Sequence, residues 1–256
     1  MPVAMKAYFI GAGPGSKDLM TVRGARILGE VSLVLYAGSL VAEEVLEFCG
    51  EGAEIVNTAG LDLEKQMEIY AKAKDEERSV ARLHSGDPAI YGAMAEQMRR
   101  LDEMGVEYEV IPGVSTFCSS AASLNSELTK PGIAQSIIIT RAEGRASPMP
   151  EGEDLESLAS HKTTMAIFLS GARLPETVAA LSKHYSPDTA VALVQKNEWP
   201  EEKRHQTVLG NLLDEIEPSD WRLSTMLLVG DVLRAEQGGD SRLYDPSYSH
   251  RFRKGA

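Results

Sequence analysis

Residues 6–15 read KAYFIGAGPG, a short apolar run that leads directly into a turn with three glycines. The run predicts a buried β-strand, and a strand that enters a glycine-rich turn is typical of nucleotide-binding α/β folds. This turn differs from a dinucleotide fingerprint, because its third glycine comes too early and Pro14 removes a backbone donor. Ala37, and no acid, follows the second predicted strand (31–36). We therefore expect a ligand other than NAD.

Strand and helix patterns alternate along most of the chain, which predicts an α/β fold built from two consecutive α/β domains. We place an N-terminal domain at 5–114, a C-terminal domain at 115–235 and a polar tail at 236–256. The expected strands are 6–10, 31–36, 53–57, 79–84, 106–111, 136–140, 164–169, 189–194, 204–209 and 225–230. An apolar stripe over 90–104 predicts a helix after the fourth strand.

The composition narrows the function classes. The chain has 256 residues and a formal net charge of −12, which argues against a partner bound through a general basic surface, so we expect neither nucleic acid nor an anionic membrane as a partner. No apolar run reaches the length of a membrane span, and the start lacks a signal-peptide pattern, so we expect a cytoplasmic protein. Histidines and cysteines show no metal-ligand spacing, and no hydrolase, NTPase or metalloprotease motif is present. We expect no resident metal.

Three glycine-rich or small-residue turns follow predicted strands of the first domain: 11–15, 85–88 and 112–116. In α/β sheets ligands bind outside the carboxyl ends of the strands, so three such turns on one edge predict a ligand site. Asp87 could accept hydrogen bonds from ligand hydroxyl or amino groups. It could also cap a helix that starts at Pro88 without any ligand, and both roles are compatible.

Five runs resemble the tetrapyrrole methylases, which use S-adenosyl-L-methionine to methylate carbon atoms of uroporphyrinogen-derived macrocycles. The resemblance covers about residues 5–234. The runs, which resemble one enzyme of that family in particular, are YAGSLV (36–41), LHSGDPAIYG (83–92), ELT (127–129), ITRAEGR (139–145) and MAIFLS (165–170).

The resemblance implies two α/β domains with the cofactor in the cleft between them, and a homodimer. The family's cofactor-binding positions correspond to nine residues here: Pro14, Ser85, Gly86, Asp87, Ile90, Ser115, Thr116, Ser170 and Asn197. Near Asn197 the KNEW sequence departs from the family's usual small residues, a change that backbone contacts would tolerate.

The implied acceptor carries many carboxylates, so binding it to an acidic protein requires local cations. We expect Arg141, Arg145 and Lys130 to bind it, together with Tyr36. Related uroporphyrinogen methylases have an Asp as proposed base where this chain has Ala37, so we assign no catalytic residue and expect catalysis by positioning.

Other functions remain open from the sequence alone. The chain could methylate another tetrapyrrole, or it could be a relative that methylates diphthine or ribosomal RNA. Its net acidity and the runs at 127–129 and 140–145 count against ribosomal RNA. It could also be a binding protein that carries a tetrapyrrole without catalysis.

Overall fold

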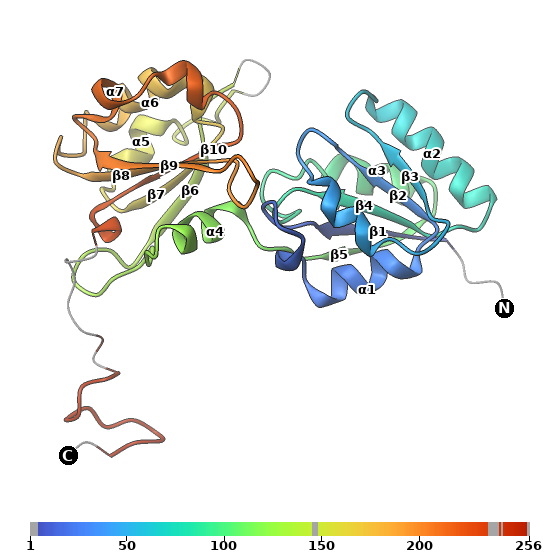
Figure 1. The fold of residues 1–256 in the computed structure, drawn as a ribbon, viewed down its shortest axis with the longest axis horizontal. Helices are drawn as coiled ribbons and strands as arrows, with labels where there is room; N and C mark the ends of the chain where they lie inside the picture. The colour runs from blue at the N-terminus through green and yellow to red at the C-terminus, as the bar shows by residue number, and fades with distance from the viewer. Residues whose placement is uncertain (1–4, 145–147, 235–240, 242, 255–256) are drawn as a thin grey trace. The chain divides into compact units, whose positions relative to one another are not determined.

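The computed structural model describes residues 5–144, 148–234, 241 and 243–254 (Figure 1). The chain forms two compact units: residues up to Ser119 together with Lys196–Glu202 form the first, and Ser120–Gln195 with the residues from Lys203 onward form the second. The helix α4 (Thr116–Ser123) passes from one to the other. The domain limits expected from the sequence stay a prediction, and most of the expected tail's first half lies outside the described residues.

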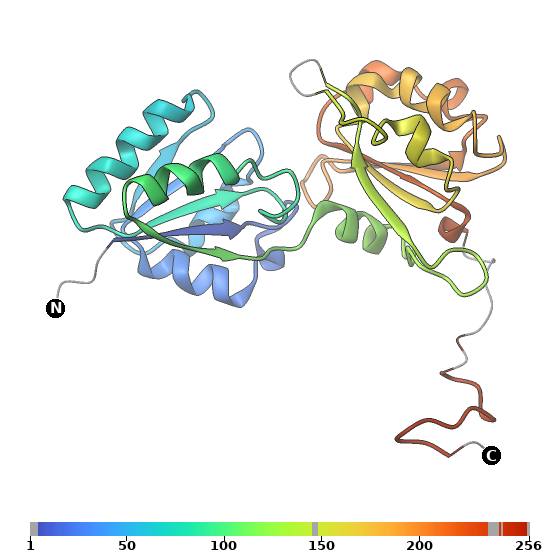
Figure 2. The same cartoon turned by 180° about the vertical axis from the view of Figure 1, so that it is seen from behind.

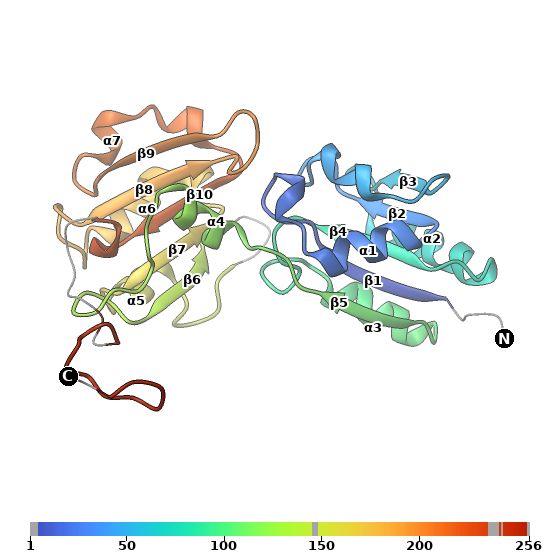
Figure 3. The ribbon, with the colours of Figure 1, turned by 60° about the horizontal axis from the view of Figure 1, so that its bottom comes forward.

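The first unit contains a five-stranded sheet whose strands are all parallel, in the order β3-β2-β4-β1-β5 (Figure 3). Its strands are β1 (Lys6–Gly11), β2 (Leu33–Tyr36), β3 (Glu54–Asn57), β4 (Val80–His84) and β5 (Glu107–Ile111). Because parallel strands all end at the same edge, the turns after these five strands share one rim.

Helices cover both faces of this sheet (Figures 1 and 2). Helix α1 (Val22–Glu30) packs on the face that includes Ile10, whereas α2 (Leu63–Asp75) and α3 (Ala95–Glu103) pack on the face that includes Phe9. Adjacent strand residues point to opposite faces, so the continuous apolar run of β1 supplies both cores.

The strand order reverses between β1 and β4. After β1 the chain moves toward β2 and β3, and after β4 it moves across to β5 on the other side. Such a switch point opens a crevice at the carboxyl ends of the two strands, which is where doubly wound sheets bind ligands.

The helix expected over 90–104 begins later than predicted, at Ala95. Residues 88–91 form a turn, and Tyr91 and Ala93 have positive φ angles of 55° and 48°, which a helix does not allow. The apolar stripe therefore extends beyond the N-terminal end of the helix.

The second unit contains a mixed sheet in the order β6-β7-β10-β8-β9, with β6 and β7 parallel and the other neighbours antiparallel. Its strands are β6 (Ile137–Arg141), β7 (Thr164–Phe168), β8 (Ala190–Gln195), β9 (Lys203–Val208) and β10 (Thr225–Val229). One face packs against α5 (Leu155–Ala159), α6 (Leu174–Leu181) and α7 (Leu212–Glu215) (Figure 1). None of the helices in the described ranges has the length and apolar character that a bilayer crossing requires.

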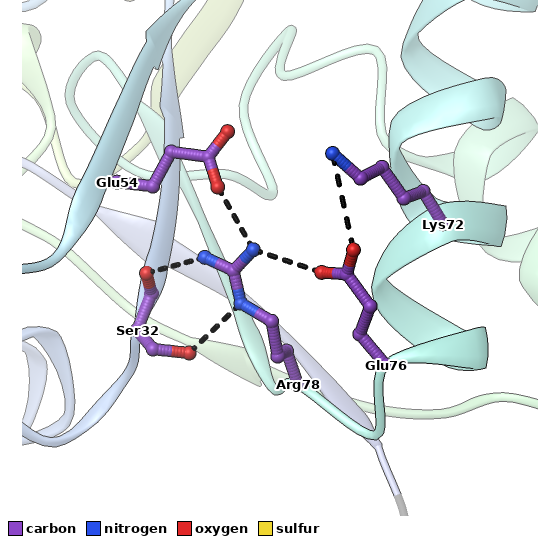
Figure 4. Close-up of polar contacts among 5 residues, drawn as sticks. All are labelled: Ser32, Glu54, Lys72, Glu76 and Arg78. Carbon is purple, nitrogen blue, oxygen red and sulfur yellow. Dashed lines mark hydrogen bonds and ion pairs between the residues drawn. The ribbon is translucent and has the colours of Figure 1, made fainter.

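At the amino edge of the first sheet, Arg78 joins the starts of three strands (Figure 4). Its guanidinium donates to Glu54 at 2.8 Å and Glu76 at 3.0 Å, and to the carbonyl and hydroxyl oxygens of Ser32 at 2.8 and 3.2 Å. Lys72 forms a longer ion pair with Glu76, at 3.8 Å. This network lies at the edge opposite the glycine-rich rim.

Candidate functional site

Three glycines bring the turns after β1, β4 and β5 into direct backbone contact. A Cβ atom on Gly11 would lie 2.5 Å from the Cα of Gly113 and 2.7 Å from the carbonyl oxygen of Gly86, and one on Gly113 would lie 2.2 Å from that oxygen. No side chain fits at these distances, so the sequence needs glycine at both positions. The three turns expected to form one ligand rim therefore form one interlocked unit.

Backbone hydrogen bonds connect the first two turns across the switch point. Gly13 and Gly86 form an isolated bridge with N···O distances of 3.3 and 2.7 Å, and Ala12 N donates to His84 O at 2.8 Å. Gly13 and Gly86 have φ angles of 77° and 65°, which favour glycine.

Asp87 uses both carboxylate oxygens to hold the turns together. Oδ2 accepts a hydrogen bond from Gly113 N at 2.9 Å, and Oδ1 accepts one from Ala89 N at 2.8 Å. The alternative role of Asp87 as a helix cap is not observed, because residues 88–91 form a turn, in which Ile90 N donates to Asp87 O at 3.1 Å, and the next helix starts at Ala95. Asp87, Ser85 and Ile90 are half-buried around this turn.

A segment from far along the chain completes this rim. Trp199 Nε1 donates to Pro14 O at 3.0 Å, and a Cβ on Gly15 would lie 2.6 Å from Trp199 Cδ1. Lys196 and Glu198 have φ angles of 47° and 66°. Positive φ at residues other than glycine costs conformational energy and is concentrated at functional sites.

Three of the expected cofactor residues carry buried polar atoms without a hydrogen-bond partner in the described structure: Ser115 Oγ, Asn197 Oδ1 and Ser170 Oγ. Their residues are 6%, 2% and 0% exposed. Buried polar groups are normally satisfied, so these atoms can accept or donate hydrogen bonds to a ligand. The two groups of the first unit, Ser115 Oγ and Asn197 Oδ1, fit polar groups of S-adenosyl-L-methionine.

Ser115 and Asn197 belong to the first unit, and Ser170 follows β7 in the second. Thr116, half-buried, begins α4. Asn197 also donates from Nδ2 to Glu202 Oε2 at 3.1 Å, which orients its carboxamide. After Ser170, a Cβ on Gly171 would lie 1.9 Å from Trp221 O, so that turn also depends on glycine.

The expected acceptor-binding residues have different surroundings. Lys130 Nζ donates to Arg234 O at 2.7 Å, and Arg141, at the end of β6, donates to Ala142 O at 3.3 Å and Pro148 O at 3.4 Å. Tyr36 is only 7% exposed and packs in the core beside α1. Arg145 lies outside the described residues.

Sequence reasoning missed two polar residues on β4, Arg82 and His84, which are 8% and 7% exposed. Burial, with a smaller contribution from the charge of Arg82, lowers the pKa of His84 to about 4, so its imidazole is neutral near pH 7. Polar residues at alternate positions of an otherwise apolar strand were the available signal, since both point to one face.

Comparisons with known proteins agree with this fold. The sequence model described as Tetrapyrrole (Corrin/Porphyrin) Methylases matches residues 6–213, and the chain belongs to that family. The predicted family and fold class are thus confirmed.

Individual relatives match over nearly their whole length. A precorrin-4 C(11)-methyltransferase of Pseudomonas aeruginosa is 45% identical over 98% of this chain and 100% of that protein. The crystal structure of a cobalt precorrin-4 methyltransferase aligns with a TM-score of 0.87 and 41% identity, covering 91% of this chain and 98% of that one. A uroporphyrin-III C-methyltransferase from Thermus thermophilus, solved with S-adenosyl homocysteine, aligns with a TM-score of 0.75 and 26% identity, covering 92% and 96%.

Proposed function

We propose that this chain transfers a methyl group from S-adenosyl-L-methionine to carbon 11 of precorrin-4 or of its cobalt form, in corrin-ring biosynthesis. The observation that carries the proposal is the near-complete match, at 45% and 41% identity, to one named methyltransferase activity. The interlocked rim on the first sheet supports it, because its buried unpaired atoms fit the cofactor.

The cofactor brings an activated methyl group on a sulfonium, so the protein needs to bind and orient rather than to activate. We assign cofactor binding to Pro14, Ser85, Gly86, Asp87, Ile90, Ser115, Thr116, Ser170 and Asn197. The hydroxyls of Ser115 and Ser170 and the carboxamide oxygen of Asn197 would meet its polar groups. Pro14 has no backbone N–H to donate, and a ligand without phosphate does not need that donor.

The chain has a formal net charge of −12, so binding an acceptor that carries many carboxylates requires local cations. We assign it first to Arg141, whose planar guanidinium matches a carboxylate. Arg145 and Lys130 follow, the latter with its ammonium already engaged by a carbonyl. Tyr36 would act mainly through the backbone that it anchors, since its ring is buried.

No side chain is assigned as a base. Ala37 follows Tyr36 and has no group that accepts a proton. Holding the methyl donor and an electron-rich ring carbon in line provides the rate enhancement, because orientation alone lowers a barrier by several kcal/mol. We further propose a cytoplasmic homodimer that binds neither nucleic acid nor membrane.

Incubation of the purified chain with precorrin-4, or with cobalt-precorrin-4, and cofactor carrying a labelled methyl tests the proposal. We expect label in the tetrapyrrole and a product heavier by one methyl group. Binding of the tetrapyrrole without label transfer would instead identify a carrier protein.

A further inference from the structure

Two successive residues at the end of β3 hold the backbone that follows β2. Asn57 Oδ1 accepts hydrogen bonds from Gly38 N at 3.1 Å and from Ala59 N at 3.0 Å. The backbone N of Thr58 donates to Tyr36 O at 2.8 Å, and its Oγ1 donates to the same oxygen at 3.1 Å. The loop at residues 37–40 is therefore fixed from the neighbouring strand.

Gly38 makes this close approach possible. A Cβ atom at Gly38 would lie 2.4 Å from Asn57 Nδ2, so any side chain there would displace the carboxamide. Within the loop, Leu40 N and Val41 N both donate to Ala37 O, at 2.9 and 3.0 Å. The loop thus has one defined conformation, set by Asn57 and Thr58.

Arg82, on β4, fixes the hydroxyl group of Thr58 by a hydrogen bond. Its Nη1 donates to Thr58 Oγ1 at 2.5 Å, and no ion pair to a carboxylate is found for it among the described residues. A buried guanidinium without a counter-charge is costly to fold. Its neighbours on that face are also polar and buried: Tyr70 and His84 both interact electrostatically with it.

The strand order places this loop beside the interlocked turns without overlapping them. β2 is next to β4, and neighbouring strands lie about 4.8 Å apart, so the ends of β2 and β3 extend the rim by about 5 and 10 Å beyond β4. Ser39 and Leu40 are exposed there, Leu40 by 55%. A flat acceptor larger than the cofactor needs such an extension with an apolar surface.

We infer that Asn57, Thr58 and Arg82 are positioning residues that fix the 37–40 loop for the tetrapyrrole acceptor, and that they govern acceptor binding rather than cofactor binding. The inference rests on the proposed function, because it takes a tetrapyrrole as the acceptor. None of the three residues needs to touch the acceptor.

Two matched pairs of variants test the inference. Thr58→Ser keeps the hydroxyl and Thr58→Val keeps the shape, while Asn57→Asp keeps the accepting oxygen and Asn57→Ala removes it. Glu54→Gln, at the other end of the same strand, is the control for a loss of stability alone (Figure 4). For each, the KM for cobalt-precorrin-4, the cofactor Kd by calorimetry and the melting temperature are measured.

Thr58→Val and Asn57→Ala each remove two hydrogen bonds that hold the loop. We expect each to raise the acceptor KM about tenfold, which corresponds to about 1.4 kcal/mol. The cofactor Kd stays within about twofold, and Thr58→Ser and Asn57→Asp stay near wild type. An equal loss of cofactor binding, or an unchanged acceptor KM in the folded variants, would overturn the inference. If Thr58→Val does not fold, the comparison of Asn57→Ala with Asn57→Asp, at an exposed position, decides the outcome.

The acceptor Kd of the chain loaded with S-adenosyl homocysteine separates the two proposals. A wild-type chain that binds the acceptor but transfers no methyl group would refute the proposed function. The same Kd, compared between Asn57→Ala and Asn57→Asp, would still decide the role of the loop.

Discussion

At the scale of single residues, the carboxylate of Asp87 joins two loops through their backbones. Its oxygens accept from Gly113 N and Ala89 N, so they hold the β4 and β5 turns in the relation that the glycines allow. Hydrogen bonds to a charged acceptor are stronger than neutral ones. We therefore expect a change at Asp87 to alter ligand binding and the shape of the rim together.

Replacing Asp87 tests this dual role. We expect Asp87→Ala to lower the free energy of unfolding by about 2 kcal/mol and to weaken cofactor binding at least tenfold, because two backbone donors lose their acceptor. Asp87→Asn, which keeps one accepting oxygen, should fall between Asp87→Ala and wild type in both calorimetry and denaturant unfolding. Wild-type cofactor affinity in Asp87→Ala would contradict the assignment.

His84 predicts a pH dependence of stability. Its pKa of about 4 in the folded protein is below the ordinary histidine value of 6.5, so the unfolded chain binds more protons between these two pH values. Stability is therefore full above pH 6.5 and is lost as the pH falls toward 4, by about 2 kcal/mol at pH 5. Unfolding curves at pH 5 and 7.5 should differ less for His84→Gln than for wild type; an equal difference in both would contradict the prediction.

At the scale of elements, the two edges of the first sheet have different chemistry. The carboxyl edge has glycines, backbone contacts and the unpaired buried oxygens of Ser115 and Asn197, whereas the amino edge has the charged network around Arg78. The first arrangement suits a ligand, and the second holds strands together.

Truncation of Arg78 should therefore affect stability and spare binding. We expect Arg78→Ala to lower the free energy of unfolding by about 1 to 2 kcal/mol, since its donors reach two carboxylates and a carbonyl. Arg26→Ala, which breaks the exposed pair with Glu30, should cost about 0.5 kcal/mol or less. A change in cofactor Kd for Arg78→Ala would contradict this separation.

The packing of Trp199 on the first turn predicts a binding defect from a small substitution. Gly15→Ala places a methyl group 2.6 Å from the indole, so Lys196–Glu202 must move away. We expect altered tryptophan fluorescence and at least about tenfold weaker cofactor binding, because Asn197 moves with the segment. Gly60→Ala, which meets open space, is the control; identical behaviour of the two variants would contradict the prediction.

The sequence predicts the strands more accurately than the segment between β4 and α3. All ten expected strands are present with ends within two residues, because buried strands have a strong apolar signal. The predicted helix starts too early, because residues 90–94 continue the apolar pattern while Tyr91 and Ala93 have positive φ angles.

The site followed a similar division. The three turns could be predicted from glycine and proline alone, but the hydrogen bond from Trp199 to Pro14 joins residues 185 positions apart. The hydrogen bond from Gly38 N to Asn57 Oδ1 also depends on which strands are neighbours in the sheet. Local patterns do not contain such contacts.

At the scale of the whole molecule, the family, the cofactor and the acceptor together define the proposed reaction. The chain is a tetrapyrrole methylase with a formal charge of −12, and its proposed acceptor is a polycarboxylate. Positioning of that acceptor through local cations and the 37–40 loop, rather than general attraction, would determine which ring carbon receives the methyl group.

The most direct test is the position of the transferred methyl group. Reaction of the chain with precorrin-4 and cofactor labelled with ¹³C at the methyl, followed by NMR of the isolated product, identifies the modified carbon. We predict a single enriched methyl group on carbon 11. A labelled methyl group on another ring carbon, or none, would contradict it.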